Sequence, residues 1–321
     1  MREAAFIKQN REKWQSYEEH ATTDADELAE RYVELTDDLS YANTFYPKSN
    51  TALYLNNLTS TFHHTIYRNR AESWKRIIDF WRYDVPLTVH ENFAKLIYAF
   101  TIFTIAAGIG WLSAAYDDTF VRLILGDYYV NMTIENIEAG DPMAVYSSQG
   151  STPMFLGITM NNIQVSILAF LYGLFFSLGT FYLIVSNGIM LGAFQYFFYK
   201  YNYLLVSLLT VWIHGVLEIS SIIVAGAAGF CLGNSIIFPK TYSRVESFKR
   251  GTKSGLTLVA GCIPLFIIAG FLESFVTRHS TVSLHVSAAI IIVSIIFIRW
   301  YFVVYPFQLY KSQNDATNRK N

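Results

Sequence analysis

Long stretches without a charged side chain decide what this chain can fold into. Residues 96–115 contain no Asp, Glu, Lys or Arg, and a helix of about 20 apolar residues crosses the roughly 30 Å hydrocarbon core of a bilayer. The other apolar runs cover residues 165–185, 188–198, 204–238, 256–272 and 286–298. Because backbone polar groups inside a bilayer must be paired within the protein, we predict an all-α bundle of transmembrane helices.

The N-terminal part has a different composition. Residues 1–95 hold half of the 24 Lys and Arg residues, and apolar residues recur at helical spacing at Leu28, Tyr32, Leu35 and Leu39. We predict a soluble helical region over residues 1–92 that ends in an amphipathic segment at the lipid surface. The first residues lack the apolar core of a signal peptide, so we expect this region to face the cytosol.

Charge asymmetry sets the predicted topology of the transmembrane region, residues 93–310. Residues 116–160 are rich in Asp and Glu, with Arg122 as the single basic residue, so we predict an outer loop. Residues 239–253 are rich in Lys and Arg, so we place this loop, like the tail at residues 311–321, in the cytoplasm.

The number of crossings follows from this charge pattern. An even number must precede the basic loop, which predicts six crossings, with five as the alternative. In the six-crossing arrangement the second span runs over residues 165–185, and Asn187-Gly188 separates it from a short third span at residues 188–198. Residues 200–202 lie at an outer turn, residues 204–213 form a short re-entrant helix, and the fourth span starts at Gly215.

Three ionisable residues fall inside the predicted spans: His214, Glu218 and Glu273. A charged residue there costs at least about 2.5 kcal/mol on insertion scales, so each needs a partner or a function. His214 and Glu218 are four residues apart and share a helix face. Glu273 ends its own span and Asn161 and Asn162 precede the second, so we expect a polar cluster at one depth.

This cluster has two interpretations. His and carboxylates can bind zinc or relay protons, or they can form a hydrogen-bonded network that only packs helices. The sequence contains no His-Glu-x-x-His pattern, so we favour packing and predict no catalytic residue, metal or cofactor.

Small residues on the fourth span suggest close helix packing. Gly226, Gly229 and Gly233 have small-x-x-x-small spacing, which serves internal packing or a homodimer. We interpret Cys231 and Cys262, both in apolar runs, as packing residues. The net charge of −1 argues against a nucleic-acid partner.

Several motifs together resemble one known family. They are Asn161-Asn162, Ser186-Asn187-Gly188, His214-Gly215-Val216-Leu217-Glu218, Ala225-Gly226-Ala227-Ala228-Gly229 and Ala269-Gly270-Phe271-Leu272-Glu273-Ser274-Phe275. The chain resembles the stage II sporulation protein M family over nearly its whole length. The resemblance implies a multi-pass protein of the bacterial cytoplasmic membrane, with both termini cytoplasmic.

The resemblance also suggests a function. The founding member anchors a peptidoglycan-degrading complex with a lytic transglycosylase and an amidase. A large cytosolic N-terminal region is typical of relatives in bacteria that do not sporulate, often encoded near a MoxR-type ATPase. We therefore expect a non-enzymatic scaffold or assembly component of envelope machinery, in contact with lipid and envelope proteins.

Two alternatives remain. The fold is similar to the permease half of exporters of the ABC type, which suggests a transporter subunit. An intramembrane metal-dependent enzyme using His214, Glu218 and Glu273 is the third possibility. A water-accessible cavity that reaches these residues would favour the permease, and stoichiometric bound metal would favour the enzyme.

Overall fold

The computed structural model describes residues 2–20, 22, 24–67, 74–147, 150–277 and 283–318, and within these ranges it is helical without strands. The predicted all-α class is confirmed. Two compact units divide the chain, Met1–Ile77 and Ile78–Asn321. The division falls inside the short helix α4 (Trp74–Asp79).

The N-terminal unit contains three helices around a small core of its own. They are α1 (Glu3–Glu19), α2 (Ala25–Phe45) and α3 (Asn50–Tyr67). The core residues are Phe6, Trp14, Leu35, Ala42, Ala52, Leu55, Leu58 and Phe62. Asp24 caps α2 by accepting a hydrogen bond from the Asp26 amide.

Polar atoms at the edge of this core are paired. The Trp14 indole donates to Asp38 at 2.8 Å, and the Tyr17 hydroxyl donates to Glu34 at 2.7 Å. Burial, aided by Glu34, raises the pKa of Tyr17 to about 12, so the phenol stays neutral. The described helices of this unit thus share an apolar core whose edge carries hydrogen-bonded polar groups.

Six helices in the described residues are long and apolar enough to cross a membrane, in agreement with the prediction of six and not five. They are Phe93–Tyr116, Ser151–Leu174, Leu178–Lys200, Leu204–Ile237, Arg244–Thr277 and Leu284–Asp315. They contain, in order, α6 (Phe93–Tyr116), α9 (Ser151–Leu171) with η3 (Tyr172–Leu174), α10 (Leu178–Lys200), α11 (Leu204–Ile237), α12 (Arg244–Phe271) with η4 (Leu272–Thr277), and α13 (Leu284–Arg299) with η5 (Trp300–Val304) and α14 (Tyr305–Asn318).

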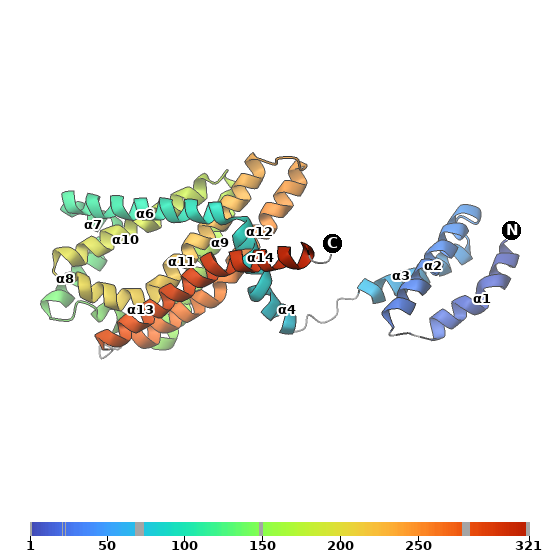
Figure 1. Ribbon diagram of the computed structural model, residues 1–321, viewed down its shortest axis with the longest axis horizontal. Helices are drawn as coiled ribbons and strands as arrows, with labels where there is room; N and C mark the ends of the chain where they lie inside the picture. The colour runs from blue at the N-terminus through green and yellow to red at the C-terminus, as the bar shows by residue number, and fades with distance from the viewer. Residues whose placement is uncertain are drawn as a thin grey trace. The chain divides into compact units, whose positions relative to one another are not determined.

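Shorter elements lie at the two ends of this bundle (Figure 1). One end carries α7 (Asp118–Leu125), α8 (Asp127–Glu138) and η2 (Ala144–Ser147), and we call it the α8 end. The loop between α11 and α12 marks the opposite end, which we call the basic-loop end. The short elements η1 (Phe80–Asp84) and α5 (Val85–Glu91) pack there, where the Tyr301 hydroxyl donates to the Trp81 carbonyl at 2.7 Å.

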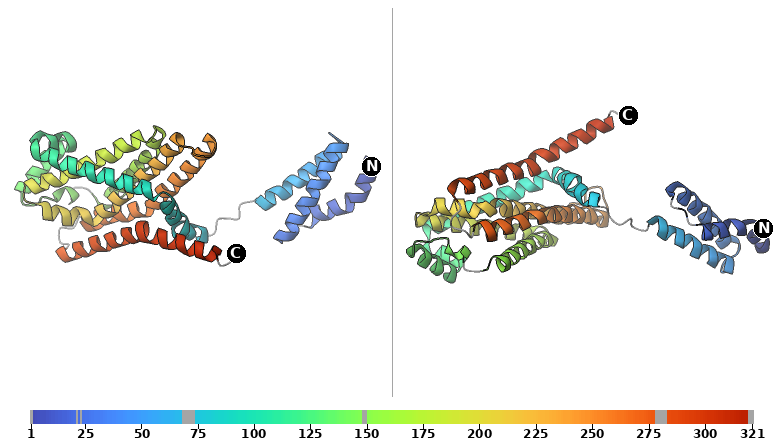
Figure 2. Two further views of the ribbon diagram at one scale, coloured as in Figure 1. Left: turned by 45° about the horizontal axis from the view of Figure 1, so that its top comes forward. Right: turned by 90° about the horizontal axis from the view of Figure 1, so that it is seen from below.

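Helix α11 is the centre of the bundle. In its most apolar stretch 72% of the residues are buried, whereas the corresponding share in Leu284–Asp315 is 17%. Leu284–Asp315 runs along one edge of the bundle (Figure 2). A Cβ atom at Gly229 would collide with the Ala169 carbonyl and the Thr180 hydroxyl, and one at Gly233 with Ser177. The turn between α9 and α10 therefore sits directly on the glycines of α11.

The predicted boundaries of the second to fourth spans are wrong. Residues 165–185 are not one span, because the chain reverses at Phe176 and Ser177, both with positive φ. Asn187-Gly188 lies inside α10 rather than between helices. The glycine does not end a helix there but lets α10 approach α6 closely. Residues 204–213 are not a separate re-entrant helix but the first turns of α11.

Replacing Gly229 by Ala should destabilise the bundle by about 1–3 kcal/mol, because its Cβ has no space beside Ala169 and Thr180. Gly108→Ala is the matched control, since a Cβ there meets no atom within 4 Å. Thermal unfolding of the detergent-solubilised protein measures both. Equal melting temperatures for the two variants would contradict the close packing.

A fragment of residues 1–67 should fold by itself, and Leu35→Ala should cost it about 2–5 kcal/mol because Leu35 is fully buried. Val33→Ala, at a side chain 58% exposed, should change the free energy of unfolding by no more than about 0.5 kcal/mol. Urea denaturation followed by circular dichroism gives both values. Non-cooperative unfolding of the unchanged fragment would show that it needs the rest of the chain.

Candidate functional site

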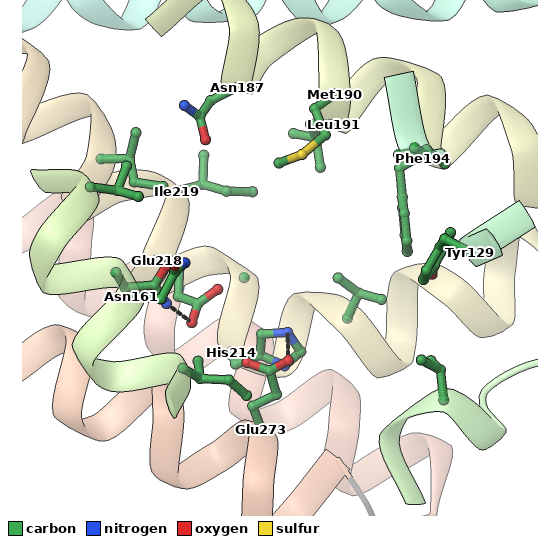
Figure 3. Close-up of a pocket in the computed structure, with 18 of the residues that line it drawn as sticks. Tyr129, Asn161, Asn187, Met190, Leu191, Phe194, His214, Glu218, Ile219 and Glu273 are labelled. Atoms are coloured by element: carbon green, nitrogen blue, oxygen red, sulfur yellow. Dashed lines mark hydrogen bonds and ion pairs between the residues drawn. The ribbon is translucent and has the colours of Figure 1, made fainter. Parts of the chain in front are cut away.

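A chamber of about 840 Å³ lies among α9, α10 and α11, and residues of α7, α8 and η2 line it toward the α8 end (Figure 3). Most of its wall is apolar, including Met190, Phe194 and Ile219. Its polar side chains are Asn161, Asn162, Asn187, His214, Glu218 and Glu273, together with Tyr128 and Tyr129 on α8. The chamber thus brings together all five residues of the predicted polar cluster.

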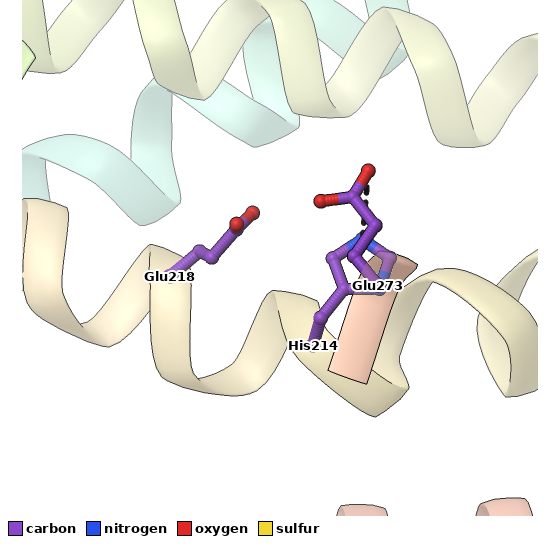
Figure 4. Close-up of side chains that lie close together, drawn as sticks. All are labelled: His214, Glu218 and Glu273. Carbon is purple, nitrogen blue, oxygen red and sulfur yellow. Dashed lines mark ion pairs between the residues drawn. The ribbon is translucent and has the colours of Figure 1, made fainter. Parts of the chain in front are cut away.

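His214, Glu218 and Glu273 form the core of this cluster (Figure 4). One ligand-type atom from each of the three lies within 4.8 Å of those of the other two. His214 Nε2 is 3.8 Å from Glu273 Oε1, which is too long for a direct hydrogen bond. His214 is only 3% exposed, whereas Glu218 and Glu273 are partly buried.

Neighbouring polar groups orient two of these side chains. His214 Nδ1 lies 3.2 Å from Thr277 Oγ1. The Asn162 amide donates to Glu218 Oε1 at 2.5 Å. These contacts hold the imidazole from its Nδ1 side and Glu218 through one of its two oxygens.

The backbone explains how the three residues meet. His214 and Glu218 are one turn apart on α11, and Glu273 lies in η4, a π-helical stretch that continues α12. A π-helical turn shifts side-chain direction within a helix and is frequent at functional sites. Gly157 and Gly215 line the chamber, and a Cβ at Gly157 would meet no atom within 4 Å.

The depth of the cluster differs from the prediction. Asn161 and Asn162 were expected just before the second span, and His214 at the start of a helix. They lie instead well inside α9 and α11. The reason is that both helices start earlier than the apolar runs suggested.

Two chamber residues, Asn187 and Tyr129, and one neighbour of the cluster, Thr277, escaped the sequence prediction. Asn187 was assigned to a helix end, Thr277 was not considered, and Tyr129 lies in the predicted loop. Burial raises the pKa of Tyr129 to about 12, so it lines the chamber as a neutral phenol. Asn187 is part of a motif already singled out, and its position between two adjoining apolar runs was the available signal.

A second cavity, an apolar groove of about 910 Å³, lies among α6, α10, α11 and α13. Arg299, an exposed residue on α13, lines it and was overlooked among the ionisable residues of the spans. Gln195 also lines the groove and is 7% exposed. Within the described structure its Nε2 has no hydrogen-bond partner.

Chemically, the chamber cluster offers one imidazole nitrogen and two carboxylates in an apolar bundle. Two neighbouring carboxylates repel each other when ionised, and burial also disfavours their charge. Such a group can hold protons or a cation, or bind a polar ligand. The described chamber lining contains no serine or cysteine, and the hydroxyl beside the imidazole is that of Thr277.

Comparison with known proteins agrees with this architecture. The family model for stage II sporulation protein M matches residues 99–278, and a domain of unknown function (DUF8413) matches residues 4–68. No curated protein and no solved structure matches the chain. Since the first match spans more than half of the 321 residues and includes the chamber cluster, this chain belongs to the stage II sporulation protein M family.

Proposed function

We propose that this protein is a non-enzymatic scaffold or assembly component of peptidoglycan-related envelope machinery. Its family is one of non-catalytic membrane proteins. We place it in a bacterial cytoplasmic membrane, with the N-terminal unit, the basic loop and the C-terminus in the cytoplasm. The supporting observation is the charge of the connections, basic at residues 239–253 and acidic around α7 and α8.

The packing of the basic-loop end carries the proposal. There Gly173 contacts Gly229, Gly233 contacts Ser177 and Gly251 contacts Ser235 so closely that no Cβ would fit. The chamber lining on α11 goes no further toward that end than Ile222. The chamber is therefore a blind pocket in this structure, which suits a binding role better than passage.

The N-terminal unit gives such a component a place to hold a partner. Phe45 and Leu53, on either side of the turn between α2 and α3, are 58% and 61% exposed. Apolar side chains exposed together are typical of protein interaction sites. We propose that a cytosolic partner, such as a MoxR-type ATPase, binds this turn.

Solubilisation in mild detergent should yield the protein together with a stoichiometric partner. The double variant Phe45→Asp, Leu53→Asp should lose that partner, because charge at both positions removes the apolar contact. Glu12→Lys and Glu30→Lys, both at exposed positions elsewhere in the unit, form the control pair. Size-exclusion chromatography with mass spectrometry reads out the complex.

An unchanged protein that always elutes alone would count against a scaffold. Equal loss of the partner in both double variants would show that the turn is not the binding surface. Circular dichroism of residues 1–67 checks that each variant keeps its helices.

A permease subunit is the second candidate function, and the chamber itself favours it. The chamber holds six polar side chains from the spans, at a depth in the membrane where burying polar groups is costly. Transporters place such sites near the bilayer midplane and expose them alternately to each side. The two functions differ in access to the chamber. In a permease the chamber opens at some stage to the basic-loop side, whereas in a scaffold it does not.

Labelling of introduced cysteines distinguishes them. For a scaffold, Asn161→Cys should react with a membrane-impermeant thiol reagent only from the α8 side, because Asn161 is an exposed chamber residue. Ile184→Cys, at a fully buried position, should not react. The native Cys231 and Cys262 are buried and should give little background.

Thr241→Cys, in the exposed basic loop, should react only from the cytoplasmic side and so tests the orientation. Reaction of Asn161→Cys from both sides would favour the permease and overturn the blind pocket. The reaction rate on each side of sealed vesicles is the measurement.

A further inference from the structure

We propose that His214, Glu218 and Glu273 bind one divalent transition-metal ion, with Zn²⁺ as the probe that tests the site. The proposal goes beyond the scaffold role and does not depend on it. It concerns only the chamber and leaves the cytosolic turn aside.

The distances fit a metal better than a direct ion pair. A tetrahedral Zn²⁺ with bonds of about 2.0–2.2 Å holds its ligand atoms about 3.4 Å apart. The donor atoms of the three residues lie within 4.8 Å of one another, and the His214–Glu273 pair is 3.8 Å apart. Small rotations of the two glutamate side chains would close the remaining gap.

The surrounding hydrogen bonds have the form of support for metal ligands. A metal-binding imidazole usually donates its other N–H to an oxygen, and a ligating carboxylate is usually itself hydrogen-bonded. Here Thr277 Oγ1 lies 3.2 Å from His214 Nδ1, and Asn162 donates to Glu218. In the tautomer with the proton on Nδ1, the lone pair of Nε2 points toward the carboxylates.

Charge balance favours a doubly charged ion. The described chamber lining contains two carboxylates and no Lys or Arg. Two buried carboxylates without a counter-charge are strongly disfavoured in an apolar environment. One divalent cation makes the site neutral, whereas a neutral state without a metal needs two extra protons shared among His214, Glu218 and Glu273.

The ligand set also narrows the choice of ion. An imidazole nitrogen is a good ligand for Zn²⁺ and other transition metals, whereas Mg²⁺ and Ca²⁺ prefer oxygen ligands alone. Three protein ligands leave a tetrahedral ion one open position. That position would face the chamber, beside Asn161 and Asn187, and would allow a polar ligand to bind.

A bound ion would join two elements far apart in the sequence. His214 and Glu218 belong to α11, and Glu273 belongs to η4 at the end of α12. The ion would fix the α8 end of α12 against α11, at the end where these helices surround the chamber. The metal thus has a structural role besides its open position.

The test measures metal in the full-length protein purified in detergent without chelators. After Zn²⁺ loading and gel filtration, elemental analysis should find about one Zn²⁺ per chain. Glu218→Gln, Glu273→Gln and His214→Gln should each lower the affinity at least tenfold. Glu246→Gln, the same change at an exposed glutamate, should leave the affinity unchanged.

A spectroscopic readout identifies the ligands directly. Co²⁺ in place of Zn²⁺ should give the intense visible bands of a tetrahedral site, lost in the three variants and kept in Glu246→Gln. Thr277→Val removes only the hydroxyl beside His214 and should weaken binding about tenfold while the fold is kept. Thr277→Val therefore tests the site even if a ligand variant fails to fold.

Two outcomes would overturn the proposal. One is an unchanged protein that retains no metal after loading, with no Co²⁺ bands, which would leave a protonated hydrogen-bonded cluster. The other is metal that stays bound in all three ligand variants, which would place it elsewhere. Neither outcome affects the partner experiment, so failure here is distinct from failure of the scaffold.

Discussion

The close approach of backbones on the glycine face of α11 is the contact on which the rest of the bundle depends. Lipid tails are as apolar as helix side chains, so burial alone does not hold helices together in a membrane. Close packing at Gly226, Gly229 and Gly233 holds the helices together instead. The residues directly against these glycines are Ile184, Thr180 and Ser177 of the α9–α10 hairpin. Any larger side chain would force that hairpin away.

The chamber follows from this contact at one end. The α9–α10 hairpin is held against α11 at the basic-loop end, and nearer the α8 end the same helices enclose the chamber. Most of its wall is apolar, but His214, Glu218 and Glu273 line it together with three asparagines. Ionisable side chains inside a membrane protein are costly, which is why the occupancy of this cluster matters.

Much of this was accessible from the sequence. Apolar runs and charge asymmetry predicted the helical class and six spans, and the four-residue spacing placed His214 and Glu218 on one face. Span boundaries failed because hydropathy is uniform across the α9–α10 reversal. That reversal depends on positive φ at Phe176 and Ser177, neither of which is a residue that signals a turn of this kind.

The sequence could not show whether the polar cluster is tightly packed or lines a chamber, because this depends on the empty space between the helices. At Gly157 an added Cβ would meet nothing, whereas at Gly229 it would collide with two helices. The two glycines look alike in a sequence, yet one leaves space and the other removes it. Glycine thus allows close helix packing at one end of the bundle and leaves empty space at the other. The polar cluster lies at the second end, where the helices leave room for a ligand.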